Sequence, residues 1–249
     1  MKYPLTLACI CSFAASIICG ADVKPAKVSP SFEQMATSRV SDLEASVNVL
    51  KADQDELKKI GKDFGLAYRL KNIVMWFKKP SKLRMEGKIG QQAALYIVNG
   101  ATRFYSIPAI RLQKKDDLGA AAGKRYSLIE VGLISRVELA SASGKYLRDE
   151  DVEGAHSHVF EVTYRGDDTT RYVVWIDPRT HVIRKREWYD GAGKLKAIFN
   201  YRDVKEVSEG IWVPTKIEIV NSDGVLAGVT MYSGLKVNQD LEDSLFNIS

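Results

Sequence analysis

The stretch TRYVVWIDPRTHVIRKREWYDG, residues 170–191, decides the fold. Apolar and aromatic residues dominate two runs, at 170–176 and 181–189, and Asp177-Pro178 separates them. Asp190-Gly191 ends the second run. Because β-branched and aromatic residues favour strands while Asp, Pro and Gly favour turns, the stretch predicts two successive strands of an antiparallel meander.

The same alternation of strand and turn signals extends in both directions along the chain. Further strands are expected near 157–165, 194–203, 211–220 and 225–236, with turns at Gly166-Asp167-Asp168, Ser208-Glu209-Gly210 and Asp223-Gly224. Upstream, apolar runs occupy 66–78, 83–89, 93–98 and 102–107, with a tight turn at Asn99-Gly100. The fold class predicted from this pattern is α+β, with a curved antiparallel sheet forming an unclosed β-barrel.

The α part of this prediction rests on helix-capping signals in two regions. Ser31 with Gln34 forms a capping box, and Asp53 with Glu56 starts a further turn or two that ends near Gly61 or Gly65. Between them an apolar stripe recurs at roughly helical spacing: Phe32, Met35, Leu43, Val47 and Leu50.

A second helix is predicted in the middle of the chain. Ser127 with Glu130 is a third capping box, and the helix is expected to run to about Ala142. A glycine- and alanine-rich loop at 116–125 precedes it. Both helical regions are expected to cover the concave side of the sheet.

Residues 1–21 have the pattern of a secretory signal peptide. Lys2 is followed by an apolar run over 5–18, which is shorter than a membrane span, and small residues precede a cleavage site after Ala21. All three cysteines lie in this segment, so the mature chain would have no cysteine chemistry. Lipidation of Cys19 is the alternative, although Ile18 departs from the lipoprotein pattern.

The rest of the chain is expected to form one exported domain. Residues 22–30 predict an exposed lead-in, and residues 31–249 a single domain located in the periplasm. The net charge of +5 is mild, and acidic residues are mixed throughout. Because no basic run with interleaved aromatic residues is present, nucleic acid is not an expected partner.

Histidines and carboxylates offer little chemistry in the sequence. His156 and His158 lie two apart, so on a strand both face the same way, as a metal pair would. No third ligand is evident nearby in the sequence, which favours water-exposed histidines at a strand end. His181 is expected in the turn after Asp177-Pro178.

The acidic clusters Asp149-Glu150-Asp151 and Asp167-Asp168 are expected in polar turns, where solvation accounts for their charge. The chain has no nucleophile elbow, no phosphate-binding glycine loop and no dinucleotide fingerprint. The sequence therefore predicts a protein that is not an enzyme and has no catalytic residue, metal or cofactor.

The apolar face of the sheet is the remaining candidate site. A filled core accounts for any one of its residues, but a large curved sheet under two helical regions leaves room for an apolar ligand. Flexible methionine side chains suit variable acyl chains. The residues expected to face inward and bind ligand are Met75, Phe77, Leu83, Met85, Leu95, Ile97, Phe104, Phe160, Val162, Val174, Ile176, Phe199, Ile217, Ile219, Val229 and Met231.

Several segments, in order, resemble the LolA/LolB superfamily of lipoprotein carriers and related outer-membrane lipoprotein-sorting proteins. The segments are MWFKKPSKLR (75–84), IVNGATRFYSIP (97–108), WIDP (175–178), WYDGAG (188–193), YRDV (201–204), WVPTKI (212–217) and LEDSLF (241–246). Each is of modest specificity, and their order along residues 31–248 is the stronger argument.

The resemblance implies a hydrophobic cavity under a helical lid, in a soluble monomeric carrier. It implies that acyl chains of lipoproteins or other lipids are bound, with an inner-membrane release complex and an outer-membrane acceptor as partners. In the best-known carriers an arginine just before a turn proline ties the lid shut. Here Lys79 precedes Pro80, and lysine lacks the planar fork of donors, so lid opening is expected to differ or be absent.

Three alternatives remain open at this point. The first is an envelope sensor of the RseB type that binds a protein partner. The second is a hydrolase acting on envelope lipids or glycans, for which His156 and His158 are the candidate centre. The third is a purely structural envelope protein.

Overall fold

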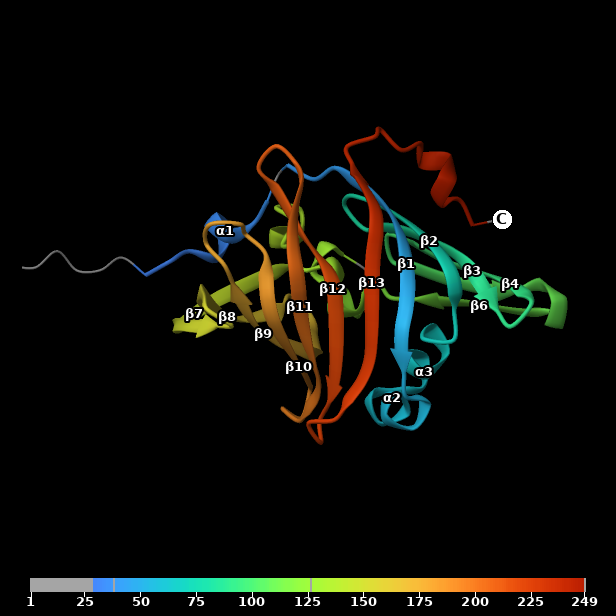
Figure 1. Ribbon diagram of the computed structural model, residues 1–249, viewed down its shortest axis with the longest axis horizontal. Helices are drawn as coiled ribbons and strands as arrows, with labels where there is room; N and C mark the ends of the chain where they lie inside the picture. Colours follow the sequence, from blue (N-terminus) through green and yellow to red (C-terminus); the bar gives the residue numbers. More distant parts are fainter. Residues whose placement is uncertain (1–28, 38, 126, 249) are drawn as a thin grey trace, which may run out of the picture.

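One large antiparallel sheet makes up most of the protein (Figure 1). The computed structural model describes residues 29–37, 39–125 and 127–248. The predicted signal peptide over 1–21, the alternative lipidation at Cys19 and residues 22–28 of the predicted lead-in lie outside the described residues.

Thirteen strands and several short helices are found in the described part of the chain. The strands are β1 Asp42–Ala52, β2 Lys71–Lys78, β3 Lys82–Ile89, β4 Gln92–Asn99, β5 Thr102–Ile107, β6 Leu112–Asp117, β7 Ala142–Val152, β8 Ala155–Tyr164, β9 Asp167–Ile176, β10 Ile183–Asp190, β11 Leu195–Ser208, β12 Ile211–Asn221 and β13 Leu226–Val237. The α-helices are α1 Phe32–Met35, α2 Gln54–Ile60 and α3 Lys62–Ala67. The 3-10 turns are η1 Pro108–Ile110, η2 Ala122–Lys124, η3 Leu128–Val131, η4 Glu138–Ala140 and η5 Asp243–Phe246.

The sheet consists of two meanders joined at a single pair of strands. Strands β1 to β6 form one meander, β7 to β13 form the other, and β1 pairs with β13 between them. Strands β6 and β7 are the two edges, so the sheet does not close into a barrel. The predicted curved, unclosed antiparallel architecture is confirmed.

The segment between the two edge strands, residues 118–141, is here called the connector. Its Leu128 and Ile129 side chains are buried. The Tyr201 hydroxyl on β11 donates to the Ile129 carbonyl at 2.8 Å, and the Ile183 N–H donates to the Gly132 carbonyl at 2.8 Å. The connector therefore packs on one face of the sheet, which we call the inner face.

The core lies between the inner face and the segments that cover it. One cluster of buried side chains gathers on β8 to β13 around Phe160 and Ile217, together with α1, α2 and part of the connector. A second gathers on β1 to β4 around Leu43 and Phe77, together with other connector residues. Packing on both meanders fixes the connector across the sheet.

The predicted first helix is correct only for its first turn. Strand β1 occupies 42–52, where alternate residues Leu43, Ala45 and Val47 are buried. Leu50, which the helical stripe placed inside, is 57% exposed. Leu43 and Val47 are four residues apart, a spacing that puts two side chains on one face of a helix or of a strand. The segment forms a strand because it pairs with β2 and β13.

The predicted middle helix is replaced by two 3-10 turns, η3 and η4. The Gly132 carbonyl accepts its hydrogen bond from β10, and the Ile134 carbonyl accepts the Thr37 N–H at 2.7 Å. Because these carbonyls bond to other segments, a continuous helix does not form. Gly132 itself takes a left-handed conformation, with φ of 84°.

Two edge strands occupy segments where no strand was expected. Strand β6 extends into the predicted mobile loop at 116–125, and β7 contains the cluster Asp149-Glu150-Asp151, for which a polar turn was the wrong prediction. Asp167 likewise begins β9 rather than lying in a turn, and it is 6% exposed. The charged residues of β6 and β7 are tolerated because an edge strand is open to solvent on one side. Asp167 lies on an interior strand instead, where its carboxylate accepts the Gly123 N–H at 2.9 Å.

Other turn and cap signals are confirmed. The Asp53 carboxylate accepts the N–H groups of Asp55 and Glu56 at 3.2 Å and starts α2. Gly100 has a φ of 61° in the β4–β5 turn, and His181 lies in the β9–β10 turn with a φ of 61°. Within the described ranges, no helix has the length and apolar character needed to cross a membrane.

Gly228 on β13 makes room for α3 to dock through Tyr68. A Cβ atom at position 228 would lie 2.8 Å from Cζ of the buried Tyr68 ring. We expect Gly228→Ala to lower the free energy of unfolding by about 1–3 kcal/mol, as overpacking does. Urea denaturation measures this loss. Adding Tyr68→Leu should recover part of it, and a Gly228→Ala variant as stable as the wild type contradicts the prediction.

Candidate functional site

A cavity of about 720 Å³ lies between the two meanders. One wall consists of Phe64 and Leu66 on α3 with Met85 on β3 and Tyr96 on β4. The opposite wall consists of Tyr172, Trp188 and Phe199, on β9, β10 and β11. Because strands far apart in the sheet line the same space, the curvature of the sheet creates the cavity.

Aromatic rings connect helix α3 to the opposite wall. The Phe64 ring centroid lies 5.9 Å from that of Trp188 and 6.2 Å from that of Phe199. Aromatic pairs at such separations stabilise contacts beyond their buried area. Helix α3 thus covers part of the cavity without filling it.

An ion pair between a buried arginine and a partly exposed glutamate fixes the connector to the sheet beside the cavity. Arg186 on β10 is 1% exposed, and its two Nη groups donate to the two carboxylate oxygens of Glu130 at 3.0 and 2.8 Å. The guanidinium also lies 4.1 Å from the Phe199 ring centroid. Burial alone would lower the pKa of Arg186, but the Glu130 carboxylate raises that pKa well above its usual value.

A second charged pair lies at the β5–β6 end of the cavity. The Arg103 guanidinium donates to Asp116 Oδ2 through Nε at 3.1 Å and Nη2 at 2.8 Å. These hydrogen bonds, with one from Lys114, lower the pKa of Asp116. The cavity therefore combines apolar walls with paired charges.

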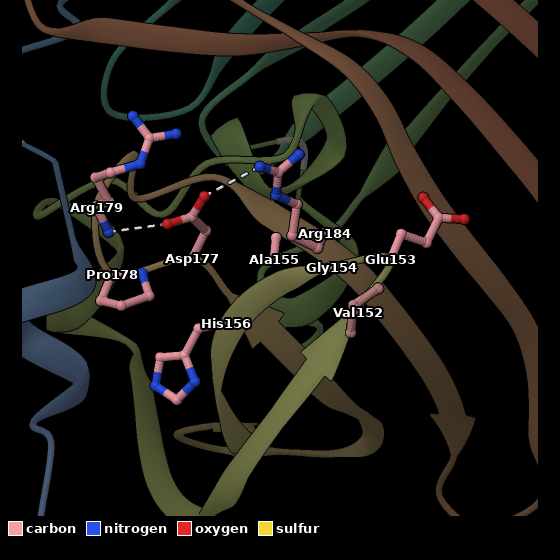
Figure 2. Close-up of a pocket in the computed structure, with 9 residues that line it drawn as sticks. All are labelled: Val152, Glu153, Gly154, Ala155, His156, Asp177, Pro178, Arg179 and Arg184. Atoms are coloured by element: carbon pink, nitrogen blue, oxygen red, sulfur yellow. Dashed lines mark hydrogen bonds and ion pairs between the residues drawn. The ribbon is translucent and has the colours of Figure 1, made fainter.

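A smaller pocket of about 460 Å³ has a different character (Figure 2). The β7–β8 hairpin around Gly154 faces the turn that contains Asp177 and Arg179. The Asp177 carboxylate accepts the Arg179 N–H at 2.9 Å and Arg184 Nη2 at 3.0 Å. Although burial opposes ionisation of Asp177, these hydrogen bonds and those from Thr180 lower its pKa.

Most of the predicted inward residues lie on the inner face. Direct pairing places Met75, Met85 and Tyr96 on one face, and Val174, Arg186 and Phe199 on the same face of the other meander. Of the predicted ligand-binding residues, Met85, Leu95 and Phe199 line the cavity. Others belong to the two core clusters: Met75, Phe77, Leu83, Phe160, Val162, Val174, Ile176, Ile217 and Ile219.

Four predicted inward residues lie on strand positions of the outer face: Ile97, Phe104, Val229 and Met231. Leu95 shares this strand position, although it also borders the cavity. Val229 pairs with Glu218 and Met231 pairs with Lys216. Lys216 and Glu218 form an ion pair with each other. Ile97 pairs with Arg84, which donates to the Leu245 carbonyl at 3.0 Å. The C-terminal segment around η5 covers this part of the outer face, so apolar residues there are buried without facing the cavity.

The predicted lid residues Lys79 and Pro80 lie in the exposed β2–β3 turn. The Lys79 N–H donates to the Ser41 carbonyl at 2.9 Å. Neither residue lines the cavity. The role of Lys79 in lid opening stays a prediction.

The prediction of water-exposed histidines is wrong for His158. Its side chain is 16% exposed, and its Nδ1 lies 2.6 Å from Oδ1 of Asp149 on β7. A third potential ligand therefore stands beside His156 and His158, where none was evident in the sequence.

The sequence reasoning did not identify Arg186, Glu130 or Trp188 as residues of the site. Glu130 was assigned to a helix cap, but its carboxylate binds Arg186. Arg186 and Trp188 alternate with Lys185 and Glu187 along β10, which put them on one face. That alternation was the available signal, although an arginine in a core-facing position is unusual.

The comparisons identify a family for this chain. A family model described as an uncharacterized protein matches residues 110–249, more than half of the chain. The chain belongs to this family. The region that the family model matches includes the connector and strands β6 to β13. The comparison with curated proteins gives no match.

Three solved structures are similar in fold. A domain from Vibrio parahaemolyticus described as an outer membrane lipoprotein-sorting protein has a TM-score of 0.59 and 16% identity, over 83% of this chain and 89% of that chain. A LolA superfamily protein from Nitrosomonas europaea has a TM-score of 0.56 and 15% identity, over 87% and 94%. A DUF1329 family protein from Desulfovibrio piger has a TM-score of 0.53 and 16% identity, over 86% and 92%. The predicted LolA-like fold is confirmed.

Glu138 in the connector predicts a specific pH dependence of stability. Burial raises its pKa to about 7, although its carboxylate accepts the Ser135 N–H at 2.7 Å. The folded state therefore binds this proton more tightly than the unfolded state, where the pKa is 4.5. As the pH rises from about 4.5 to about 7, the free energy of unfolding should fall by roughly 3 kcal/mol through this group.

Glu138→Gln should remove that component. Urea denaturation at several pH values between 4.5 and 7.5 compares the two proteins, because other titrating groups then cancel. Parallel stability curves for the variant and the wild type contradict the assignment.

The Arg186–Glu130 pair predicts strong coupling between the connector and the sheet. Glu130→Ala leaves the buried guanidinium without its counter-charge, so a loss of about 3–5 kcal/mol in unfolding free energy is expected. Arg186→Met combined with Glu130→Ala should lose less than the two single changes added together. A double-mutant cycle by urea denaturation measures this difference, and additive losses rule the coupling out.

Proposed function

We propose that this protein is a soluble, non-enzymatic carrier in the periplasm, which holds acyl chains of lipoproteins or other lipids and passes them to an acceptor at the outer membrane. The observation that carries the proposal is the apolar-walled cavity between the two meanders. Its volume of about 720 Å³ lies within the range of about 300–1,000 Å³ found for ligand sites. The fold similarity to a lipoprotein-sorting domain and a LolA superfamily protein supports it.

The hydrophobic effect would drive loading of the cavity. Each methylene removed from water contributes about 0.8 kcal/mol, so ten buried methylenes contribute about 8 kcal/mol before the costs of binding. The walls offer thioether and aromatic surfaces at Met85, Trp188 and Phe199. Such surfaces accept chains of different shape, because they need no directed hydrogen bonds.

Release would follow from the same physics. An acceptor with a better apolar site removes the chain, or a movement that narrows the cavity expels it. Helix α3 is the element placed for that movement, since Phe64 contacts both Trp188 and Phe199 on the opposite wall. An inner-membrane complex that supplies the lipid and a monomeric carrier are part of the proposal.

Two neighbouring alanines on β4 provide a matched test. Ala94 lines the cavity, whereas Ala93 is exposed and pairs with Lys88. We expect Ala94→Trp to weaken binding of a fluorescent fatty-acid probe at least tenfold, because the indole fills part of the cavity. Ala93→Trp should bind the probe as the wild type does. The proposal fails if neither probe binding nor co-purified lipid, measured by mass spectrometry, is detected in the wild type.

Crosslinking in living cells extends the same test to the cargo and partners. A photoreactive residue at Met85 faces the cavity, and one at Met231 lies on the outer face. Lipid adducts are expected from Met85 and not from Met231. Equal lipid labelling at both positions contradicts binding in the cavity.

A further inference from the structure

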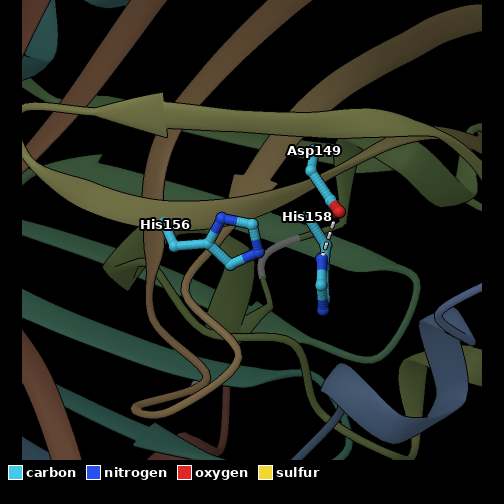
Figure 3. Close-up of side chains that lie close together, drawn as sticks. All are labelled: Asp149, His156 and His158. Carbon is cyan, nitrogen blue, oxygen red and sulfur yellow. Dashed lines mark hydrogen bonds and ion pairs between the residues drawn. The ribbon is translucent and has the colours of Figure 1, made fainter.

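The β7–β8 hairpin brings three potential metal ligands together (Figure 3). Asp149 on β7 pairs directly with His158 on β8, and Asp151 pairs with His156. Directly paired residues of antiparallel strands project from the same face. The two histidines are two residues apart, so the hairpin places all three side chains of Asp149, His156 and His158 on one face.

The distances between these groups are short. One donor atom from each of Asp149, His156 and His158 lies within 4.8 Å of the other two. Oδ1 of Asp149 is 2.6 Å from Nδ1 of His158, and the two imidazole centroids are 5.4 Å apart. The His156 side chain is 55% exposed, so it can turn toward an ion and solvent can reach the site.

We propose that Asp149, His156 and His158 bind a divalent transition-metal ion such as Zn²⁺. Two imidazoles and a carboxylate suit zinc, whereas Mg²⁺ and Ca²⁺ prefer oxygen ligands alone. When the ion binds, the ring proton of His158 moves from Nδ1 to Nε2, which leaves Nδ1 free to coordinate beside Oδ1 of Asp149. The two donor atoms then separate to about 3.3 Å, the spacing set by tetrahedral bonds of about 2.0–2.1 Å. Water occupies the fourth position.

A neighbouring carboxylate orients one of the ligands. Oδ1 of Asp151 lies 3.5 Å from Nδ1 of His156, and carboxylates in this position commonly hold metal-bound histidines in place. Such an arrangement leaves Nε2 of His156 for the ion. The site lies on the β7–β8 hairpin and includes no residue that lines the larger cavity.

Zinc titration of the full chain by calorimetry tests the site, after the thiols of Cys9, Cys11 and Cys19 are alkylated. We expect one ion per chain. His158→Ala and His156→Ala should each weaken binding at least tenfold. His181→Ala is the matched control, since His181 lies in another turn, and it should bind zinc as the wild type does.

NMR of the histidine rings gives a second measurement that does not depend on variants. Zinc should shift the ring signals of His156 and His158 and leave those of His181 unchanged. The proposal is overturned if His156→Ala/His158→Ala binds zinc as tightly as the wild type, or if His181→Ala loses as much affinity. Ala94→Trp should retain zinc binding, so failure of the carrier proposal and failure of this one are distinguishable.

Discussion

Pairing of β1 with β13 is the constraint on which the rest of the structure depends. Leu43 faces Val237 and Val47 faces Tyr232 across this pair, so the first and last strands of the sequence are neighbours in the sheet. Without it, each meander would have two open edges and an apolar face too large to cover. With it, the two halves form one curved surface, and strands distant in the sheet face each other across a cavity.

The ion pair between the buried Arg186 and Glu130 then determines what covers that surface. A buried guanidinium is tolerated when a carboxylate faces it in a good geometry, and both Nη groups of Arg186 donate to Glu130. The connector is thereby held against β10 and leaves space toward β3 and β4. The connector packs on both meanders without filling the space between them, and its Leu118, Ala121 and Glu130 line the cavity.

Sequence patterns predicted the strands whose apolar and polar residues alternate between clear turns, from β8 to β13 and from β3 to β5. They failed where two periods fit the same residues, as with Leu43 and Val47 in β1, whose pairing partner β13 is distant in the chain. The sequence predicted that an apolar cavity exists, but it wrongly assigned Ile97 and Phe104 to that cavity. Both residues are apolar and buried, and their apolar character does not reveal that they lie on the outer face of the sheet. The Arg186–Glu130 pair depends on the tertiary fold, which a local pattern does not encode.

The two edge strands have a consequence for how the protein behaves in a crowded compartment. An open sheet presents unpaired backbone groups at each edge, which can recruit another chain and start fibrous aggregates. Here β6 has the sequence LQKKDD, and β7 carries Arg148, Asp149, Glu150 and Asp151 in succession. Pairing a second molecule with either edge would take these charged side chains partly out of water, so the unclosed sheet carries its own protection against edge-to-edge assembly.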